Sequence, residues 1–363
     1  MLIAFHEEYL FLIRTCALFC ILVMLFNLYD HLSRKRRNNN HQKRTQRIAD
    51  ILESYDQAGE AEQKKQRRAL TRMLYRPVGI LALQAALDEL KWDGSNQIPP
   101  KSKELLGDLL TKVFFVYRAS EDYVRSLLID VIIRCGIVSD RLNGWLLEYA
   151  ESNNLLLKTE ALRCICIQRN PEMIVRALER ISRKPLFFSN KLITDTLMVF
   201  RGDNAMLLEK LWAALDSFSP EIQVSVLQLL ASKDDGSYAQ NVLQLLKNEK
   251  TDMEVRLAAI KYFSSVNAPE CVAQLAKLLT AETWEYAAVA AKVLENYDCA
   301  PVFDALKVGV CSKNWYVRNN CARTIVNSCS SAQVREALEV SDRYGRNSVR
   351  YALETKEKEA VAL

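Results

Sequence analysis

The sequence predicts an all-α protein, an α-solenoid of helical hairpins preceded by a single transmembrane helix. Two observations predict this fold. First, one helical segment recurs seven times with a period of about 32 residues, which is typical of stacked helical hairpins. Second, an apolar stretch near the N-terminus is long enough to cross a bilayer core. The seven segments are anchored at Val124, Leu157, Ser189, Ile222, Val255, Tyr286 and Val317.

The apolar stretch runs from Leu10 to Tyr29, about 20 residues, the length of a helix that spans a membrane. Arg14 lies near one end, where its long side chain could reach the lipid headgroups. A cleavable signal peptide is the alternative, but the stretch is long and no small-x-small cleavage site follows it. Residues 1–33 are therefore predicted to be an N-terminal tail and a transmembrane helix.

The charges around this stretch predict its orientation. Glu7 and Glu8 precede it, whereas seven basic residues and no acid occupy residues 34–47. The positive-inside rule then places the N-terminus outside and the solenoid in the cytoplasm of a cell (inner) membrane. The basic residues are expected to contact anionic lipid headgroups. They are Arg34, Lys35, Arg36, Arg37, Lys43, Arg44 and Arg47.

The net charge of +5 comes from this basic segment. Residues 34–47 contribute +7 and residues 1–33 contribute −2, so residues 48–363 sum to zero. A neutral repeat region gives no compositional support for a nucleic-acid partner, although one face of it could still be basic.

Two segments connect the predicted span to the repeats. Residues 34–66 are polar and are expected to form a basic juxtamembrane stalk. Residues 67–100 have helical apolar spacing broken at Pro77, followed by a loop from Trp92 to Pro100. This part is predicted to be an N-terminal helical cap that covers the apolar edge of the first repeat.

Each repeat is predicted to be a helix, a turn and a second helix, over residues 101–345. Apolar or small residues recur on one face of each first helix, and most first helices have a polar residue able to cap them three positions before the anchor. Residues 346–363 are charged and are expected to be a C-terminal tail with frayed ends. The second helices are predicted at residues 142–151, 171–181, 205–215, 238–247, 269–279, 301–310 and 332–340.

Three segments resemble the HEAT-repeat family in their acid, Val-Arg and Ala/Leu signature. They are Glu121-Asp-Tyr-Val-Arg125-Ser-Leu-Leu-Ile129, Asp252-Met-Glu-Val-Arg256-Leu-Ala-Ala-Ile260 and Asn314-Trp-Tyr-Val-Arg318-Asn-Asn-Cys-Ala322. The resemblance implies a HEAT-like solenoid with a ladder between repeats built by Arg125, Asp252, Arg256 and Arg318. The repeats at Ser189, Ile222 and Tyr286 lack the arginine. A basic stripe that binds a ligand is the alternative role for these side chains.

Catalytic signatures are missing from the sequence, so a non-enzyme without cofactor or metal is predicted. The three histidines lie in or beside the apolar stretch, and no glycine-rich phosphate loop occurs. The ten cysteines form no CxxC pair and are expected to be small core residues in a reducing compartment. A HEAT-like DNA glycosylase would need aromatic residues and an Asp along a groove. The tryptophans of the repeats, however, fit core or interface roles better.

These features favour a non-catalytic, membrane-anchored scaffold or accessory subunit whose partner is an integral membrane protein. The layout of one span, a basic segment and repeats resembles accessory proteins of processive family 2 glycosyltransferases that make exopolysaccharide. Aromatic residues at helix starts are the candidate contacts with the partner. They are Tyr123, Trp284, Trp315 and Tyr316.

A second hypothesis is a membrane-tethered protein that binds or senses nucleic acid, for example in phage defence. It requires a continuous basic stripe along the repeats. The stripe would be built from Arg125, Lys158, Arg163, Arg256 and Lys261.

Overall fold

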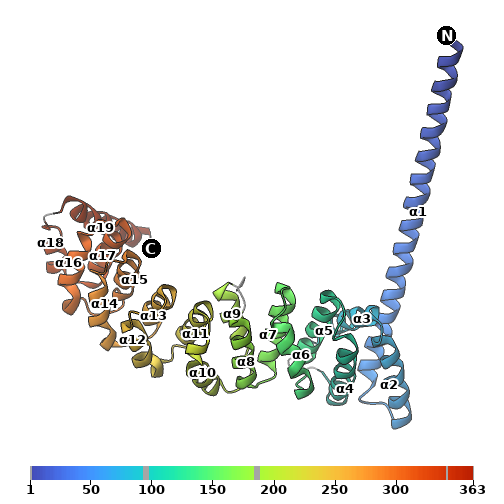
Figure 1. The fold of residues 1–363 in the computed structure, drawn as a ribbon, viewed down its shortest axis with the longest axis horizontal. Coiled ribbons are helices and arrows are strands. Elements are labelled where there is room, and N and C mark those ends of the chain that lie inside the picture. Colours follow the sequence, from blue (N-terminus) through green and yellow to red (C-terminus); the bar gives the residue numbers. More distant parts are fainter. Residues whose placement is uncertain (1, 93–97, 184–188, 341, 363) are drawn as a thin grey trace. The chain divides into compact units, whose positions relative to one another are not determined.

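The computed structural model describes the backbone of residues 2–92, 98–183, 189–340 and 342–362, and side chains from residue 18 to residue 359 within those ranges. The middle of the predicted loop, residues 93–97, lies outside this description. The chain divides into two compact units, Met1–Leu146 and Leu147–Leu363 (Figure 1). Every regular element described is a helix, as the sequence predicts.

The first unit is a small helical stack. It contains α1 (Leu2–Ser54), α2 (Glu60–Leu74), α3 (Pro77–Glu89), α4 (Pro100–Tyr117) and α5 (Asp122–Cys135), then a 3-10 turn (Asp140–Leu142) and the start of α6 (Asn143–Ala150). The C-terminal part of α1 packs on α3, because Ile48 and Leu52 at i, i+4 spacing are fully buried. Helix α3 in turn packs on α5, and α4 on α5.

Helix α1 joins parts of two predicted domains, since the predicted span and the first part of the stalk, residues 34–54, form one continuous helix; the rest of the stalk is a turn and the start of α2. Among the described residues, none of the helices combines the length and the apolar character that a membrane crossing requires. The side chains of residues 10–17, the first part of the predicted span, lie outside the described residues. From Leu18 to Leu32, the large apolar side chains of α1 are all exposed.

Helix α3 approaches the end of α2 so closely at position 79 that only a glycine fits there. A Cβ there would overlap the carbonyl oxygen of Met73 and lie 2.6 Å from its carbonyl carbon. We expect Gly79→Ala to lower the free energy of unfolding by about 1–3 kcal/mol or more, because backbone must move to make room. Gly107→Ala in α4, where no atom lies within 4 Å of the added carbon, should be neutral or stabilising by about 0.5–1 kcal/mol. Thermal or urea unfolding of both variants checks this; equal losses would contradict it.

Helix α4 begins at two prolines, so its cap comes from elsewhere in the chain. The carboxylate of Asp56 accepts the amide protons of Lys101 (3.0 Å) and Ser102 (2.9 Å), and the Ser102 hydroxyl lies 2.7 Å away. Burial raises the pKa of Asp56, but the hydrogen bonds from Ser102 and Lys101 outweigh it and leave this pKa below its usual value of 3.8.

Asp56→Ala is expected to lower the free energy of unfolding at pH 7 by about 0.5–2 kcal/mol through loss of this cap. Because the folded pKa is depressed, the charged form stabilises the fold above about pH 3.8, and this contribution disappears as the pH falls through the folded pKa. Unfolding curves of the wild type and the variant should therefore converge at low pH. A gap that persists or widens in acid would rule out this role.

The second unit is an α-solenoid of two helical layers. One layer contains α7 (Leu155–Ile167), α9 (Asn190–Leu197), α11 (Pro220–Ser232), α13 (Met253–Ser265), α15 (Trp284–Leu294), α17 (Trp315–Ser328) and α19 (Arg343–Ala362), each packed on the next. The other contains α8 (Pro171–Ser182), α10 (Asn204–Ala213), α12 (Ala239–Lys247), α14 (Val272–Leu278), α16 (Phe303–Val310) and α18 (Ser331–Ala337). Short 3-10 turns precede α11, α12, α14 and α16.

The predicted starts of the first helices are confirmed. In six of the seven repeats, the residue three positions before the anchor is the N-cap of the first helix. Asn154, Asp252 and Asn314 accept amide protons of the first turn, and the anchors Leu157, Val255 and Val317 are buried. In the third repeat, α9 starts at Asn190 with Ser189 as its N-cap.

Side chains that donate to the backbone of the preceding or following repeat join successive repeats. The Thr324 hydroxyl donates to the Ala291 carbonyl (2.7 Å), and the Tyr297 hydroxyl donates to the carbonyls of Phe263 (2.9 Å) and Val266 (3.1 Å). Such bonds satisfy buried polar groups and fix the register of adjacent repeats.

One expectation about the C-terminal part is wrong. The predicted tail at residues 346–363 is mostly the helix α19, whose buried Val349 and Ala352 lie on α17 and α16. Its high charge masked this apolar face. Among the cysteines, Cys299 and Cys329 lie side by side on neighbouring turns, with Cα atoms 5.1 Å apart, a distance at which the two side chains can form a disulfide. The other described cysteines of the repeats are mostly buried, as the sequence predicts.

Candidate functional site

Exposed aromatic side chains gather on α15, α17 and α19. The Trp284 ring stacks on the Tyr316 ring, with centroids 5.5 Å apart, and Trp315 meets Tyr316 edge to face at 5.1 Å. Helix α19 adds two more exposed rings, Tyr344 and Tyr351. These five side chains, which we call the aromatic surface, are between 40% and 67% exposed.

The aromatic surface borders a pocket of about 160 Å³ between α17 and α19. Trp315, Asn319 and Arg323, four residues apart on α17, form one wall, and Tyr351, Thr355 and Lys356 of α19 form the other. Lys356 donates to the Val326 carbonyl (2.6 Å), which fixes α19 against α17. Rings beside amide, hydroxyl and guanidinium groups can bind a protein surface by stacking and hydrogen bonding.

The sequence pointed to three of these five residues. Trp284, Trp315 and Tyr316 fall in the first turns of α15 and α17, where the structure brings them together. Tyr351 was missed because residues 346–363 were expected to be a tail, and Tyr344 was missed because it follows the last predicted repeat helix, which ends at residue 340. The spacing of Val349 and Ala352 could have indicated that helix. The fourth candidate, Tyr123, is exposed on α5 in the first unit and is not part of this cluster.

The four candidate ladder residues make contacts of another kind. The Arg256 guanidinium lies 4.6 Å from the Tyr286 ring centre of the next repeat, and that of Arg318 lies 5.6 Å from the Tyr344 ring. Asp252 caps its own helix and, within the described residues, makes no ion pair. Arg125 pairs with Asp122 of its own helix. Arginine–tyrosine contacts thus join neighbouring repeats at Arg256 and Arg318.

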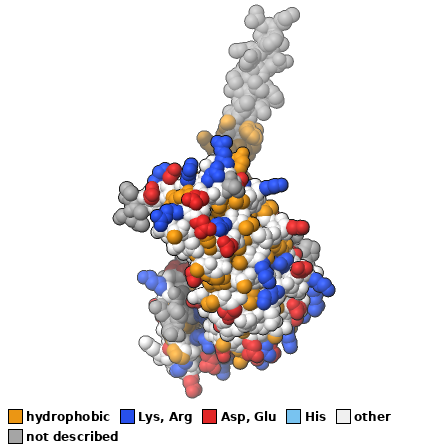
Figure 2. Space-filling model, turned by 90° about the vertical axis from the view of Figure 1, so that its left-hand side faces the viewer, with side chains coloured by type: hydrophobic (Ala, Val, Ile, Leu, Met, Phe, Trp, Pro, Cys, Tyr) orange, Lys and Arg blue, Asp and Glu red, His pale blue; other side chains and the backbone are white. Residues whose placement is uncertain are grey.

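These contacts also bear on the basic stripe of the nucleic-acid hypothesis. Lys158 is buried, Arg163 lies 3.9 Å from Glu160, and Arg256 packs on a tyrosine. Figure 2, which looks at the C-terminal end of the second unit, shows Lys/Arg and Asp/Glu side chains intermixed. The five named residues therefore do not form a continuous exposed basic stripe.

The candidate membrane-surface residues are exposed on α1. Arg34 forms an ion pair with Asp30 (2.7 Å), and Arg37 lies 3.4 Å from the Ser33 hydroxyl. Lys35 and Arg36 are also exposed. Their side chains are accessible to an anionic surface.

The described residues offer little for catalysis. They include no group of three or more His, Cys, Asp or Glu side chains that could hold a metal. Burial raises the pKa of the Cys135, Cys166 and Cys321 thiols to about 12, so these cysteines are protonated at neutral pH and poor nucleophiles.

Comparison with known proteins supports the repeat assignment. A family model of HEAT repeats matches residues 208–295, from within α10 to the end of α15. Residues 208–295 contain HEAT repeats. The resemblance drawn from the segment at Asp252 is thereby confirmed.

Several solved structures superpose in part on this chain, at low sequence identity. Kap121p superposes with a TM-score of 0.45 and 14% identity, over 85% of this chain and 40% of that protein. Kap121p bound to Pho4p gives a TM-score of 0.44 and 15% identity, over 79% and 37%. Human deoxyhypusine hydroxylase in complex with glycerol gives a TM-score of 0.29 and 15% identity, over 81% of this chain and 96% of that protein. The HEAT-repeat chain thus spans less than half of Kap121p. A comparison with curated protein sequences found no match.

Proposed function

We propose that this HEAT-repeat protein is a non-catalytic scaffold or accessory subunit that binds a partner protein at a membrane. The HEAT-repeat fold suggests a protein-interaction scaffold. The observation that carries the proposal for this chain is the aromatic surface, because exposed Trp and Tyr side chains that are fixed by stacking are typical of interface anchors.

The membrane part of the proposal rests on α1. Its side chains from Leu18 to Tyr29 are almost all apolar and exposed on every side of the helix, at 42–72% for the large ones. Such a surface is unfavourable in water and favourable in lipid. The basic residues after it, from Arg34 to Arg47, would lie among cytoplasmic headgroups. We propose a single-pass anchor with the repeats in the cytoplasm.

The proposed partner is an integral membrane protein, and the layout of span, basic segment and repeats favours a polysaccharide-synthesising glycosyltransferase. The test is a detergent pull-down of the full-length protein from its native membrane, with bound proteins identified by mass spectrometry. Stoichiometric recovery of a multispan glycosyltransferase is the expected result. Recovery of nucleic acid, or of the protein alone, would overturn the accessory-subunit proposal.

The cysteine pair tests the orientation. Disulfides persist in oxidising compartments and are rare in the cytosol, so in cytoplasmic repeats Cys299 and Cys329 should be thiols. We expect both to be alkylated when intact cells are quenched in acid, denatured and treated with iodoacetamide before mass spectrometry. A peptide pair linked through these two cysteines, with Cys271 alkylated in the same sample, would place the repeats on the other side of the membrane.

A further inference from the structure

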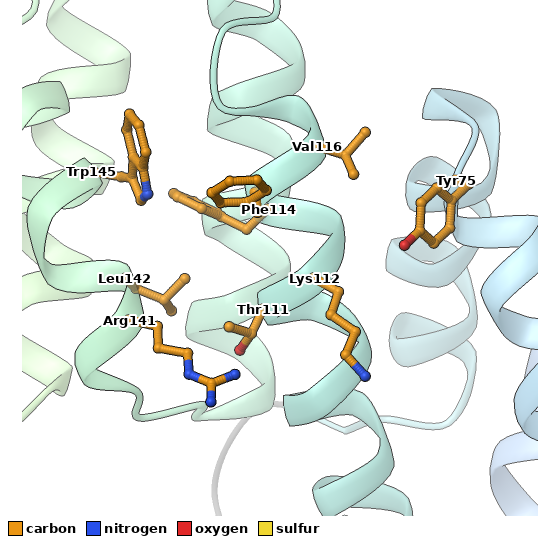
Figure 3. A pocket seen from close by; sticks show the side chains of 9 residues that line it. Tyr75, Thr111, Lys112, Phe114, Val116, Arg141, Leu142 and Trp145 are labelled. Atoms are coloured by element: carbon orange, nitrogen blue, oxygen red, sulfur yellow. The ribbon is translucent and has the colours of Figure 1, made fainter.

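The first unit has a pocket that the proposed scaffold function does not explain. It has a volume of about 320 Å³ and lies between the end of α2, the C-terminal part of α4, the 3-10 turn and the start of α6 (Figure 3). All of its lining residues belong to the first unit. They are Tyr75, Thr111, Lys112, Phe114, Phe115, Val116, Arg141, Leu142 and Trp145.

Most of the pocket wall is apolar, and part of it faces solvent. Phe115 and Val116 are 57% and 51% exposed, although they adjoin the buried Phe114. Covering such adjacent apolar side chains is favourable, at roughly 25 cal/mol per Å² of buried apolar surface. The pocket is thus suited to an apolar side chain of a ligand.

The aromatic wall is held in place before any ligand arrives. The Phe115 and Trp145 rings meet edge to face at 6.4 Å, and the Arg118 guanidinium lies 4.1 Å and 5.1 Å from their centres. The Tyr117 hydroxyl donates to the Tyr75 carbonyl (2.7 Å), which ties the end of α2 to α4. A preformed wall lowers the conformational entropy that binding costs.

The polar side of the pocket is cationic. Figure 3 shows the nitrogen ends of Arg141 and Lys112 along one side and Trp145 at the opposite end. No lining residue is an Asp or a Glu. Lys112 shares the Asp108 carboxylate with Arg67, so one acid faces two bases. In the described part of the chain, Arg141 is exposed and makes no ion pair.

We infer that this pocket binds an acidic peptide segment of the partner protein. A large apolar side chain of the segment lies against Phe115 and Val116, and an Asp or Glu next to it pairs with Arg141. Charge complementarity selects an anionic ligand, because the pocket lining contains Arg141, which has no ion pair among the described residues, and no carboxylate. We assign a peptide because the proposed function is the binding of a protein, and an anionic lipid is the alternative that the vesicle experiment below distinguishes. The inference rests on the proposed scaffold function.

The test screens the full-length protein in detergent against a displayed library of random 12-residue peptides. We expect enrichment of peptides with Trp, Phe or Leu within two residues of Asp or Glu. Phe115→Ala and Arg141→Glu should each weaken binding of an enriched peptide, measured by fluorescence anisotropy, by about tenfold or more. Replacing the peptide's acid by Lys should restore part of the binding to the Arg141→Glu variant.

Lys103→Glu is the matched control, because Lys103 is an exposed base on α4 outside the pocket lining. It should leave binding within about twofold of the wild type. Equal losses in all three variants, or enriched peptides without acids, would overturn the inference. The inference would also be overturned if vesicles of neutral and anionic phospholipid displaced the peptide from the wild type but not from the Arg141→Glu variant. If the pull-down recovers a partner equally well with Arg141→Glu, the pocket assignment fails while the scaffold proposal stands.

Discussion

Replacing Leu22 and Phe26 by lysine is expected to move the full-length protein from the membrane fraction to the soluble fraction. Both side chains are exposed, at 56% and 68%, in the C-terminal half of the apolar stretch of α1. A lysine near the centre of a membrane-spanning helix costs about 2.5–3.5 kcal/mol on insertion scales, and each change also removes a favourable apolar side chain. The cost at Phe26 is smaller, because a lysine near the end of the stretch can extend toward the headgroups, so the summed cost is about 3–6 kcal/mol.

The control is the double variant Leu22→Ile and Phe26→Leu, which keeps the apolar surface and should stay in the membrane fraction. Carbonate extraction followed by immunoblotting measures both. Neither position contacts the folded part of the first unit, so the melting temperature of that part should not change. If the lysine variant resists extraction as the wild type does, α1 is not the anchor and its apolar surface has another cover, such as a second copy of this helix.

The repeat architecture could be predicted from the sequence because each repeat depends on local rules. A capping side chain at Asn154, Asp252 or Asn314 and an apolar residue three positions later define a helix start within one turn. Prolines at 171 and 220 mark first turns in the same way. The helix α19 was missed because its apolar face is narrow. The charged residues between Glu354 and Glu359 also interrupt the helical spacing of its apolar residues.

The candidate site could be predicted only in part, because a surface depends on which helices lie side by side. Trp284 and Trp315 stand one repeat period apart, and that period alone places them at equivalent positions. The pocket at Phe115 and Trp145 depends on a 3-10 turn and on a cation between two rings, which no periodic pattern encodes. The Asp–Arg ladder implied by family resemblance also differs here, since tyrosines at 286 and 344 face the arginines instead.

Replacing Trp315 and Tyr316 together by alanine is expected to reduce partner recovery in the native-membrane pull-down by about tenfold or more. Trp and Tyr at the centre of an interface often contribute about 2 kcal/mol or more to binding, and a loss of about 1.4 kcal/mol weakens binding tenfold. The Tyr316 ring also stacks on the Trp284 ring, so removing Tyr316 leaves the Trp284 ring without this contact. Both replaced side chains are more than half exposed, and stability should change little.

The matched control is Leu156→Ala on α7, which removes an exposed apolar side chain of the same unit that is far from the aromatic surface in sequence. Partner recovery with this variant should equal that of the wild type. Both variants should have the same melting temperature in circular dichroism. Tyr123→Ala, tested in parallel, asks whether the first unit contributes an aromatic anchor as well. Undiminished recovery with the Trp315 and Tyr316 variant would remove the aromatic surface from the interface, and the partner would then have to bind the repeats elsewhere.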